Sequence, residues 1–253
     1  MKETEFKKIA NYIGEVIKDS RFYLHTYIVG GSVRDLCMGN EIKDIDLVID
    51  LENGGIEFAK YCMDKELLTH DVVLFERYGV AMFAFKEFPN EQIECVMTRG
   101  EKYLDRNSRN PETVFASIED DCIRRDLTIN ALYYNISTGE IVDMVGGLKD
   151  IDNKVIRTTN ENPDIVFDDD PLRVLRVCRF STRYGWDIEP KTYESMKKYV
   201  DRLEIISKER INDEFNKILL SDNAVMGIRT LCDIGAMKYI IPEVDEMIGM
   251  EQN

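Results

Sequence analysis

The chain has 253 residues, and its 48 Asp and Glu outweigh 33 Lys and Arg to give a formal net charge of −15 at pH 7. Hydrophobic residues make up 44% and charged residues 32%, proportions typical of a globular protein and not of a disordered one. The acidic balance argues against non-specific coating of nucleic acid, but it is compatible with a local basic groove. No apolar run approaches the roughly 20 residues that span a bilayer, so we expect no membrane partner.

The six cysteines stand far apart, with no CxxC pair and no nearby histidine cluster. This pattern argues against a structural zinc site and against a disulfide-rich scaffold. Scattered cysteines fit a reducing compartment, so we expect a cytoplasmic protein.

Strand-like and helix-like segments alternate over about the first 150 residues. Amphipathic spacing and apolar runs next to turn residues predict helices at 3–18, 32–38 and 56–68, and strands at 27–29, 45–49, 80–85 and 92–98. The segment 99–117 is polar and rich in turn residues, which predicts a mobile loop.

Strand signals thin out after residue 150. Helical spacing marks the segments 171–184, 190–204, 208–220 and 223–235. We therefore predict an α+β fold in two domains. The first, 1–150, contains a mixed β-sheet with flanking helices, and the second, 151–253, is all helical.

Two glycines separate a predicted strand from a predicted helix in the segment YIVGGSVRD. Gly30 and Gly31 permit a sharp turn and the close approach of a phosphate, and the helix start favours an anion. Ser32 adds a hydroxyl donor. Taken alone, such a turn is weak evidence, because most turns of this kind bind nothing.

Two aspartates, Asp44 and Asp46, follow this turn at the strand predicted over 45–49. Side chains two residues apart in a strand project from the same face. Two neighbouring negative charges favour a cation between them, and hard oxygen ligands suit Mg²⁺ with bound phosphates. An isolated DxD pattern is more often a solvated strand edge, but the preceding glycine turn favours a metal site. Glu94 is a third candidate carboxylate, although on its own it would be an exposed strand residue.

Arginines recur every three or four residues in the predicted helix 171–184, so they occupy roughly one third of its circumference. They are Arg173, Arg176, Arg179 and Arg183. A cationic stripe suits a polyanionic substrate, and Arg with Asp can imitate the edge of a nucleobase. The alternative is a solvated helix face paired with the acidic run 168–170.

Four motifs occur in an order that resembles the class II tRNA nucleotidyltransferases, the CCA-adding enzymes, and their relatives the bacterial poly(A) polymerases. The motifs are GGSVRD with DIDL, RRDLTINALYYN at 124–135, DMVGGLKD at 143–150 and DDPLRVLRVCRF at 169–180. The resemblance covers nearly the whole chain. It implies a nucleotidyltransferase head over 1–150 and a helical neck for RNA and nucleotide recognition over 151–253. Because family members generally continue into body and tail helices, we expect this chain to hold head and neck only.

The resemblance also implies roles for individual residues. Asp44 and Asp46 match the catalytic, metal-binding carboxylates, and Glu94 matches a supporting catalytic carboxylate. The implied nucleotide-binding residues are Gly30, Gly31, Ser32, Arg34, Arg125, Asp126, Asn130, Asp170, Arg173, Arg176 and Arg179. Among them Asp126 and Asn130 match ribose contacts, and Asp170 with Arg173 matches the pair that reads the base. The family usually has Glu where this chain has Asp169.

The implied reaction is template-independent addition of C and A residues from CTP and ATP to the 3′ end of tRNA, with release of pyrophosphate and two Mg²⁺ ions as cofactors. No obligate protein partner is evident. The alternatives are a poly(A) polymerase, a partial CC- or A-adding enzyme, a catalytically silent RNA-binding relative, or a small-molecule nucleotidyltransferase. The segment 72–85 lacks the tandem Arg/Lys pair typical of the poly(A) polymerases, which favours CCA addition.

Overall fold

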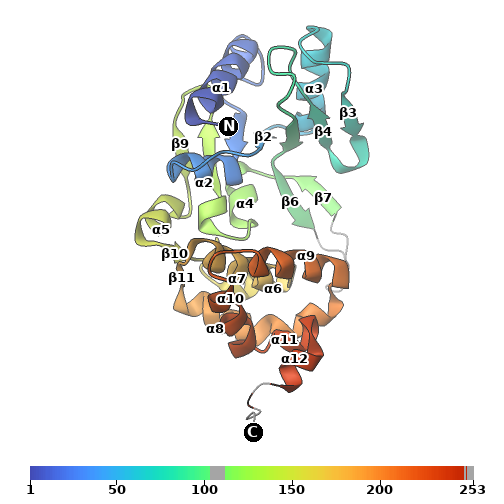
Figure 1. Ribbon diagram of the computed structural model, residues 1–253. Coiled ribbons are helices and arrows are strands. Elements are labelled where there is room, and N and C mark those ends of the chain that lie inside the picture. Colours follow the sequence, from blue (N-terminus) through green and yellow to red (C-terminus); the bar gives the residue numbers. More distant parts are fainter. Residues whose placement is uncertain (103–111, 248, 250–253) are drawn as a thin grey trace. The chain divides into compact units, whose positions relative to one another are not determined.

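The computed structural model describes residues 1–102, 112–247 and 249 (Figure 1). The chain forms two compact units, of which the first comprises Met1–Arg124 and Ile129–Leu148. The second comprises Arg125–Thr128 and Lys149–Asn253. A division at residue 150 would place the segment 125–128 in the first unit, whereas this segment lies in the second. The chain therefore passes between the units three times.

A seven-stranded sheet organises the first unit, in the order β3-β4-β5-β2-β1-β8-β9 (Figure 1). Its strands are β1 (Thr26–Val29), β2 (Ile45–Ile49), β3 (Val73–Phe75), β4 (Val80–Phe83), β5 (Ile93–Met97), β8 (Leu132–Asn135) and β9 (Ile141–Asp143). Strands β2 and β5 are parallel, and the other neighbours are antiparallel. The mixed sheet expected from the sequence is confirmed.

The α-helices of the first unit each bury part of their surface. They are α1 (Glu3–Ile17), α2 (Gly31–Cys37), α3 (Gly54–Asp64) and α4 (Ile118–Ile123), with the 3-10 turn η1 (Glu76–Tyr78). Helix α1 buries the stripe formed by Phe6, Ile9, Ala10, Ile13 and Ile17. Two short elements contain residues of both units: η2 (Thr128–Asn130) and α5 (Gly147–Asn153).

The segment predicted as a loop over 99–117 begins and ends in strands. Strand β6 (Arg99–Lys102) pairs antiparallel with β7 (Glu112–Phe115), so the loop prediction is wrong at both ends of the segment. These strands were not predicted because charged and small residues interrupt any hydrophobic alternation in the segment. The two strands are recognised only by their backbone pairing. The remainder of that prediction falls on 103–111, outside the described residues.

The second unit is built from helices. They are α6 (Pro163–Asp169), α7 (Arg173–Tyr184), α8 (Pro190–Tyr199), α9 (Lys208–Leu219), α10 (Ala224–Asp233), α11 (Met237–Ile240) and α12 (Pro242–Glu246), with the 3-10 turn η3 (Val200–Ile205). The predicted helical character is confirmed, with one exception. The short strands β10 (Val155–Ile156) and β11 (Asp187–Ile188) form a parallel pair. No helix in the described ranges is both long and apolar enough to cross a membrane.

Candidate active site

Two exposed carboxylates lie on strands β2 and β5 of the first unit, and a third lies directly before β2. Asp44 directly precedes β2 and Asp46 is its second residue, and both are exposed while the intervening Ile45 is buried. This alternation places both aspartates on one face of the strand. Glu94 is exposed on β5 and is the direct register partner of Asp46. Register partners present their side chains on the same face of a sheet, so Asp46 and Glu94 lie side by side.

The chemistry of these residues fits a divalent cation that arrives with a substrate. Within the described part of the chain, no group of three or more His, Cys, Asp or Glu residues is arranged to hold a metal ion. Mg²⁺ is usually bound through one or two carboxylates and completes its shell with waters and substrate phosphates. Asp44 and Asp46 offer that number of exposed carboxylates, so they suit Mg²⁺ bound with phosphates and not a preformed protein cage.

The glycine turn connects β1 to α2. Gly30 has φ 76° and ψ −131°, a backbone conformation that glycine adopts without the clash of a Cβ, and its N–H donates to the Leu132 carbonyl at 3.2 Å. The buried Ser32 hydroxyl donates to the carbonyl of Val29 at 3.1 Å. The hydroxyl donor that the sequence suggested for a ligand is therefore already used within the turn.

Arg34 of α2 is buried in a network that reaches across the first unit. Its Nε and Nη2 donate to the two carboxylate oxygens of Asp35 at 3.0 and 2.9 Å. Its Nη1 donates to Oδ1 of Asn130 at 2.6 Å. The structure thus joins two of the predicted nucleotide-binding residues, Arg34 and Asn130. Asp35 was not predicted as a site residue, because its position next to Arg34 in GGSVRD does not reveal that the two side chains meet.

Asp126, predicted in the first domain, belongs to the second unit. Arg176 on α7 donates to Asp126 Oδ2 from Nε at 2.7 Å, and Asp126 Oδ1 accepts from the N–H of Leu127 at 2.8 Å. The carbonyl of the neighbouring Arg125 accepts from the Thr159 hydroxyl at 2.6 Å. Burial alone would lower the pKa of Arg176. The charge and hydrogen bond of Asp126, together with the charges of Glu214 and Asp170, outweigh burial and raise that pKa above its usual value.

The arginines of the α7 stripe differ from one another in their exposure and in their binding partners. Arg173 is 8% exposed, and its Nη1 donates to the Val166 carbonyl at 3.3 Å. Arg179 forms an ion pair with the buried Glu214, with 2.9 Å between Nε and Oε2. That approach lacks hydrogen-bond alignment, and both atoms are buried without a hydrogen-bond partner among the described residues. Acids of the same unit therefore neutralise two members of the stripe, Arg176 and Arg179.

Two acids of the run before α7 form ion pairs with arginines outside that stripe. Asp168 forms an ion pair with Arg202, and Asp170 Oδ2 accepts from Arg210 Nη2 at 3.0 Å. Asp170 Oδ1 accepts from the N–H of Leu172 at 3.1 Å. Asp170 and Arg173 adjoin at the start of α7, where the Arg173 N–H donates to the Asp170 carbonyl at 3.0 Å, but their side chains make separate contacts.

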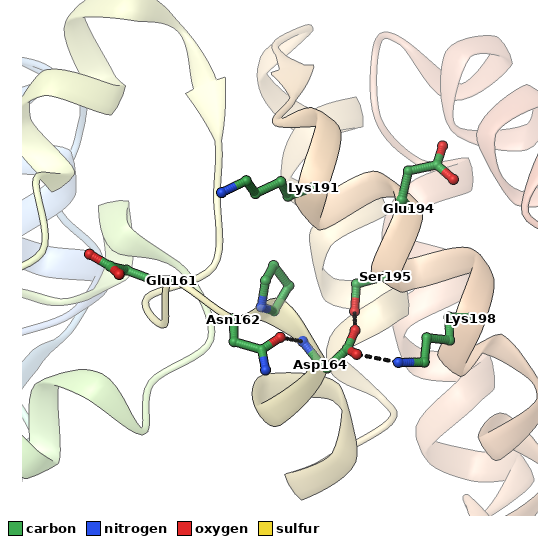
Figure 2. Close-up of a pocket in the computed structure, with 8 residues that line it drawn as sticks. Glu161, Asn162, Asp164, Lys191, Glu194, Ser195 and Lys198 are labelled. Atoms are coloured by element: carbon green, nitrogen blue, oxygen red, sulfur yellow. Dashed lines mark hydrogen bonds and ion pairs between the residues drawn. The ribbon is translucent and has the colours of Figure 1, made fainter.

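A hollow of about 400 Å³ lies elsewhere in the second unit, at α6 and α8 (Figure 2). It is lined by Glu161, Asn162, Pro163, Asp164, Lys191, Glu194, Ser195 and Lys198, none of which was predicted as a site residue. Figure 2 shows dashed lines from Ser195 and from Lys198 to the carboxylate of Asp164, to which both side chains donate. The hydrogen bond from Lys198 is the main cause that lowers the pKa of Asp164. The charge of Asp164 is thus neutralised by Lys198, and we assign no catalytic role to this hollow.

Both units match known protein families. Residues 26–157 match the poly(A) polymerase head domain. Residues 185–248 match the family described as the probable RNA- and SrmB-binding site of polymerase A.

Curated relatives align with nearly all of the chain. The Multifunctional CCA protein of Acinetobacter baumannii (strain SDF) is 34% identical over 240 residues, which cover 90% of this chain and 53% of that protein. The CCA-adding enzyme of Streptococcus agalactiae serotype V is 32% identical over 238 residues, which cover 94% of this chain and 55% of that protein. The chain therefore spans about half the length of the curated relatives it matches.

Solved structures of CCA-adding enzymes share the fold. A complex with CTP has a TM-score of 0.74 at 28% identity, covering 94% of this chain and 52% of that one. A complex with ATP has a TM-score of 0.73 at 28% identity, covering 95% and 53%. The Thermotoga maritima enzyme complexed with tRNA has a TM-score of 0.74 at 29% identity, covering 94% and 52%.

Proposed function

Because the chain belongs to the family of the poly(A) polymerase head domain, we propose that it is a tRNA nucleotidyltransferase that adds C and A residues from CTP and ATP to the 3′ end of tRNA. Relatives of this chain with CCA addition in their names support the proposal, since they align with both of its units. Structural neighbours bound to CTP, ATP and tRNA support the choice of substrates.

The observation that carries the proposal is the pairing of Asp46 with Glu94 on parallel strands, with Asp44 on the same face as Asp46. In the proposed reaction the 3′-hydroxyl of the tRNA attacks the α-phosphate of the nucleotide, and pyrophosphate leaves. Asp44 and Asp46 would hold Mg²⁺, which supplies neutralisation of the phosphate charge and a Lewis acid for the attacking and leaving oxygens. Glu94 supports these two carboxylates from the neighbouring strand.

We assign nucleotide recognition to residues of each unit separately. In the first unit, Gly30, Gly31, Ser32 and Arg34 form the turn assigned to the triphosphate, and Asn130 contacts the ribose. In the second unit, Asp170 and Arg173 read the base, while Arg125, Asp126, Arg176 and Arg179 complete the nucleotide-binding set. The ion pair of Asp126 with Arg176 supports a joint role for these two residues, because each fixes the direction of the other.

We place the reaction in the cytoplasm. All six cysteines are free in the structure. Free, mostly buried thiols fit a reducing compartment, where disulfides are rare.

Incubation of the protein with Mg²⁺, each labelled nucleotide in turn and a tRNA that lacks its 3′-terminal CCA tests the proposal. We expect incorporation of C from CTP alone, and of A only after both cytidines are present. A tRNA with an intact CCA end is the matched control and should accept no label. Failure of all four nucleotides to label either tRNA would contradict the proposal.

The same assay separates the remaining alternatives. The matched family model is named for poly(A) polymerases, so a long adenylate tail on any RNA would favour poly(A) addition. Addition that stops after CC, or that requires a tRNA already ending in CC, would identify a partial enzyme.

A further inference from the structure

Helix α2 carries a buried acid, Asp35, to which the proposed reaction gives no role. Asp35 is 4% exposed, and both of its carboxylate oxygens accept hydrogen bonds from Arg34. We propose that Asp35 is a positioning residue for nucleotide binding, which acts through Arg34 to set the orientation of Asn130. The inference deepens the proposed function and rests on it for the identity of the ligand.

The geometry of the guanidinium carries the first step. Asp35 accepts from Nε and Nη2 of Arg34, so the two planar groups are joined by two parallel hydrogen bonds. Because the guanidinium is rigid and planar, fixing Nε and Nη2 also fixes the direction of Nη1. That third nitrogen is the one that reaches Asn130 Oδ1, at 2.6 Å.

The chemistry of the amide carries the second step. Arg34 can only donate hydrogen bonds, so the oxygen of the Asn130 amide must face it. The NH₂ group of the same amide is then held on the opposite side. Asn130 thereby directs its donor group away from Arg34, the orientation needed to bind an acceptor such as a ribose or phosphate oxygen.

Burial makes the arrangement sensitive to the charge of Asp35. The side chains of Arg34 and Asp35 are each 6% exposed, and Asn130 is 7% exposed. Removing one charge of a buried pair leaves the other uncompensated, and the remaining side chain then seeks new contacts. A neutral residue at position 35 should therefore release Arg34 and, with it, Asn130.

The positioning step can be tested without any nucleotide. The side-chain ¹⁵N–¹H signals of Asn130 are identified by their absence in Asn130→Ala and are then followed in Asp35→Asn. We expect hydrogen exchange of this NH₂ group to become about tenfold faster, because the amide loses the charge-assisted bond to its oxygen that holds the whole group in place. Asp50→Asn is the matched control, since Asp50 follows the other end of β2 and its Oδ1 accepts from Thr98 at 3.1 Å. Unchanged exchange in Asp35→Asn would overturn the proposal.

Arg34→Lys provides a second variant in case Asp35→Asn does not fold. A lysine keeps the charge beside Asp35 but cannot make two parallel bonds and reach Asn130 at once. The same acceleration of exchange is expected, and its absence would equally overturn the proposal.

A double-mutant cycle tests the functional step. CTP affinity is measured by calorimetry for the wild type, Asp35→Asn, Asn130→Ala and the double variant. We expect Asp35→Asn to weaken binding about tenfold, and to weaken it less than about twofold when Asn130 is already alanine. Equal effects in both backgrounds would overturn the inference and leave the proposed function standing. A wild-type protein that binds no CTP would instead contradict the proposed function. The exchange experiment would still show whether Asp35 sets the orientation of Asn130.

Discussion

Arg176 on α7 and Asp126, fifty residues earlier in the chain, form a close ion pair, with 2.7 Å from Nε and 2.6 Å from Nη2 to Asp126 Oδ2. Asp126 is 7% exposed, so the pair ties the segment 125–128 into the second unit from a largely buried position. We predict that Asp126→Asn lowers the free energy of unfolding of this unit by about 1–3 kcal/mol, because Arg176 loses its charged partner. Urea unfolding followed by fluorescence of Trp186, the only tryptophan, measures this unit directly.

Asp213→Asn is the control for that measurement. Asp213 pairs with Lys217 at 2.5 Å, but the two side chains are 66% and 46% exposed. Exposed pairs contribute little, so we expect a change of less than about 0.5 kcal/mol. Equal effects of the two substitutions would show that the Asp126 pair does not stabilise the unit.

Gly55 gives a prediction for the first unit, because it marks a close contact between α3 and β5. A Cβ at this position would lie 2.6 Å from the carbonyl oxygen of Cys95 and 2.7 Å from the Cα of Val96. These are backbone atoms, so the helix would have to move away from the strand. We predict that Gly55→Ala lowers the free energy of unfolding by about 2 kcal/mol, measured by circular dichroism during urea unfolding.

Gly14→Ala on α1 is the matched comparison for Gly55→Ala. Its Cβ would meet nothing closer than 3.6 Å, at the Ile136 carbonyl oxygen. The higher helix propensity of alanine should then stabilise the protein by about 0.5–1 kcal/mol. Stabilisation by both substitutions would refute the close contact.

Glu189 gives a prediction for pH dependence. It caps α8 by accepting from the N–H and the hydroxyl of Thr192, at 2.7 and 3.0 Å. Burial alone would raise the pKa of this carboxyl. These two hydrogen bonds, with a third from the backbone of Lys191 and the charge of Arg157, outweigh burial and hold its pKa below the usual value. The contribution of Glu189 to stability is therefore complete above the pKa of this carboxyl in the unfolded chain, about 4.3. It is lost as the pH falls through the lower pKa of the folded protein.

Glu189→Gln isolates that contribution. The difference in free energy of unfolding between wild type and variant should be constant between pH 7 and pH 5 and should shrink toward pH 3. Unfolding followed at Trp186 measures it. A difference that stays constant down to pH 3 would be inconsistent with the lowered pKa of Glu189.

Arg173 is the residue we expect to govern the choice of nucleotide. Its buried guanidinium is held at the start of α7 by the Val166 carbonyl, next to Asp170. We predict that Arg173→Ala reduces the preference of kcat/KM for CTP and ATP over UTP and GTP by about tenfold or more, in line with the discrimination that one base-edge pair provides. Arg183→Ala, at the exposed end of the same stripe, should leave the preference unchanged. Unaltered selectivity in Arg173→Ala would remove the base-reading assignment.

Local patterns in the sequence were sufficient to predict the helix and strands around the glycine turn. The apolar run before Gly30, the helix after it and the alternation around Asp46 depend on residues close in the chain, and the structure contains β1, α2 and β2 at these places. The hairpin of β6 and β7 was missed because its strands carry no apolar alternation. The parallel pair of β10 and β11 was missed because each strand has two residues and its partner lies some thirty residues away.

Contacts between distant segments account for the other differences between the predicted site and the structure. Nothing near Asp126 in the sequence indicates that Arg176 will neutralise it, or that the segment 125–128 joins the second unit. Likewise, the spacing of arginines on α7 predicts a shared face but not that Glu214 on α9 covers part of it. Burial of Asp35 beside Arg34 depends on the packing of α2 near Asn130, 96 residues further along the chain.

The most direct test of the proposed chemistry is the rate of nucleotide incorporation by Asp44→Asn and Asp46→Asn. Both substitutions preserve size and remove a carboxylate that we assign to the cation and phosphates. The account predicts that each lowers the rate by roughly a thousandfold with an unchanged unfolding transition, while Asp50→Asn beyond the other end of β2 stays within about twofold of the wild type. Substantial turnover in both Asp44→Asn and Asp46→Asn would contradict it.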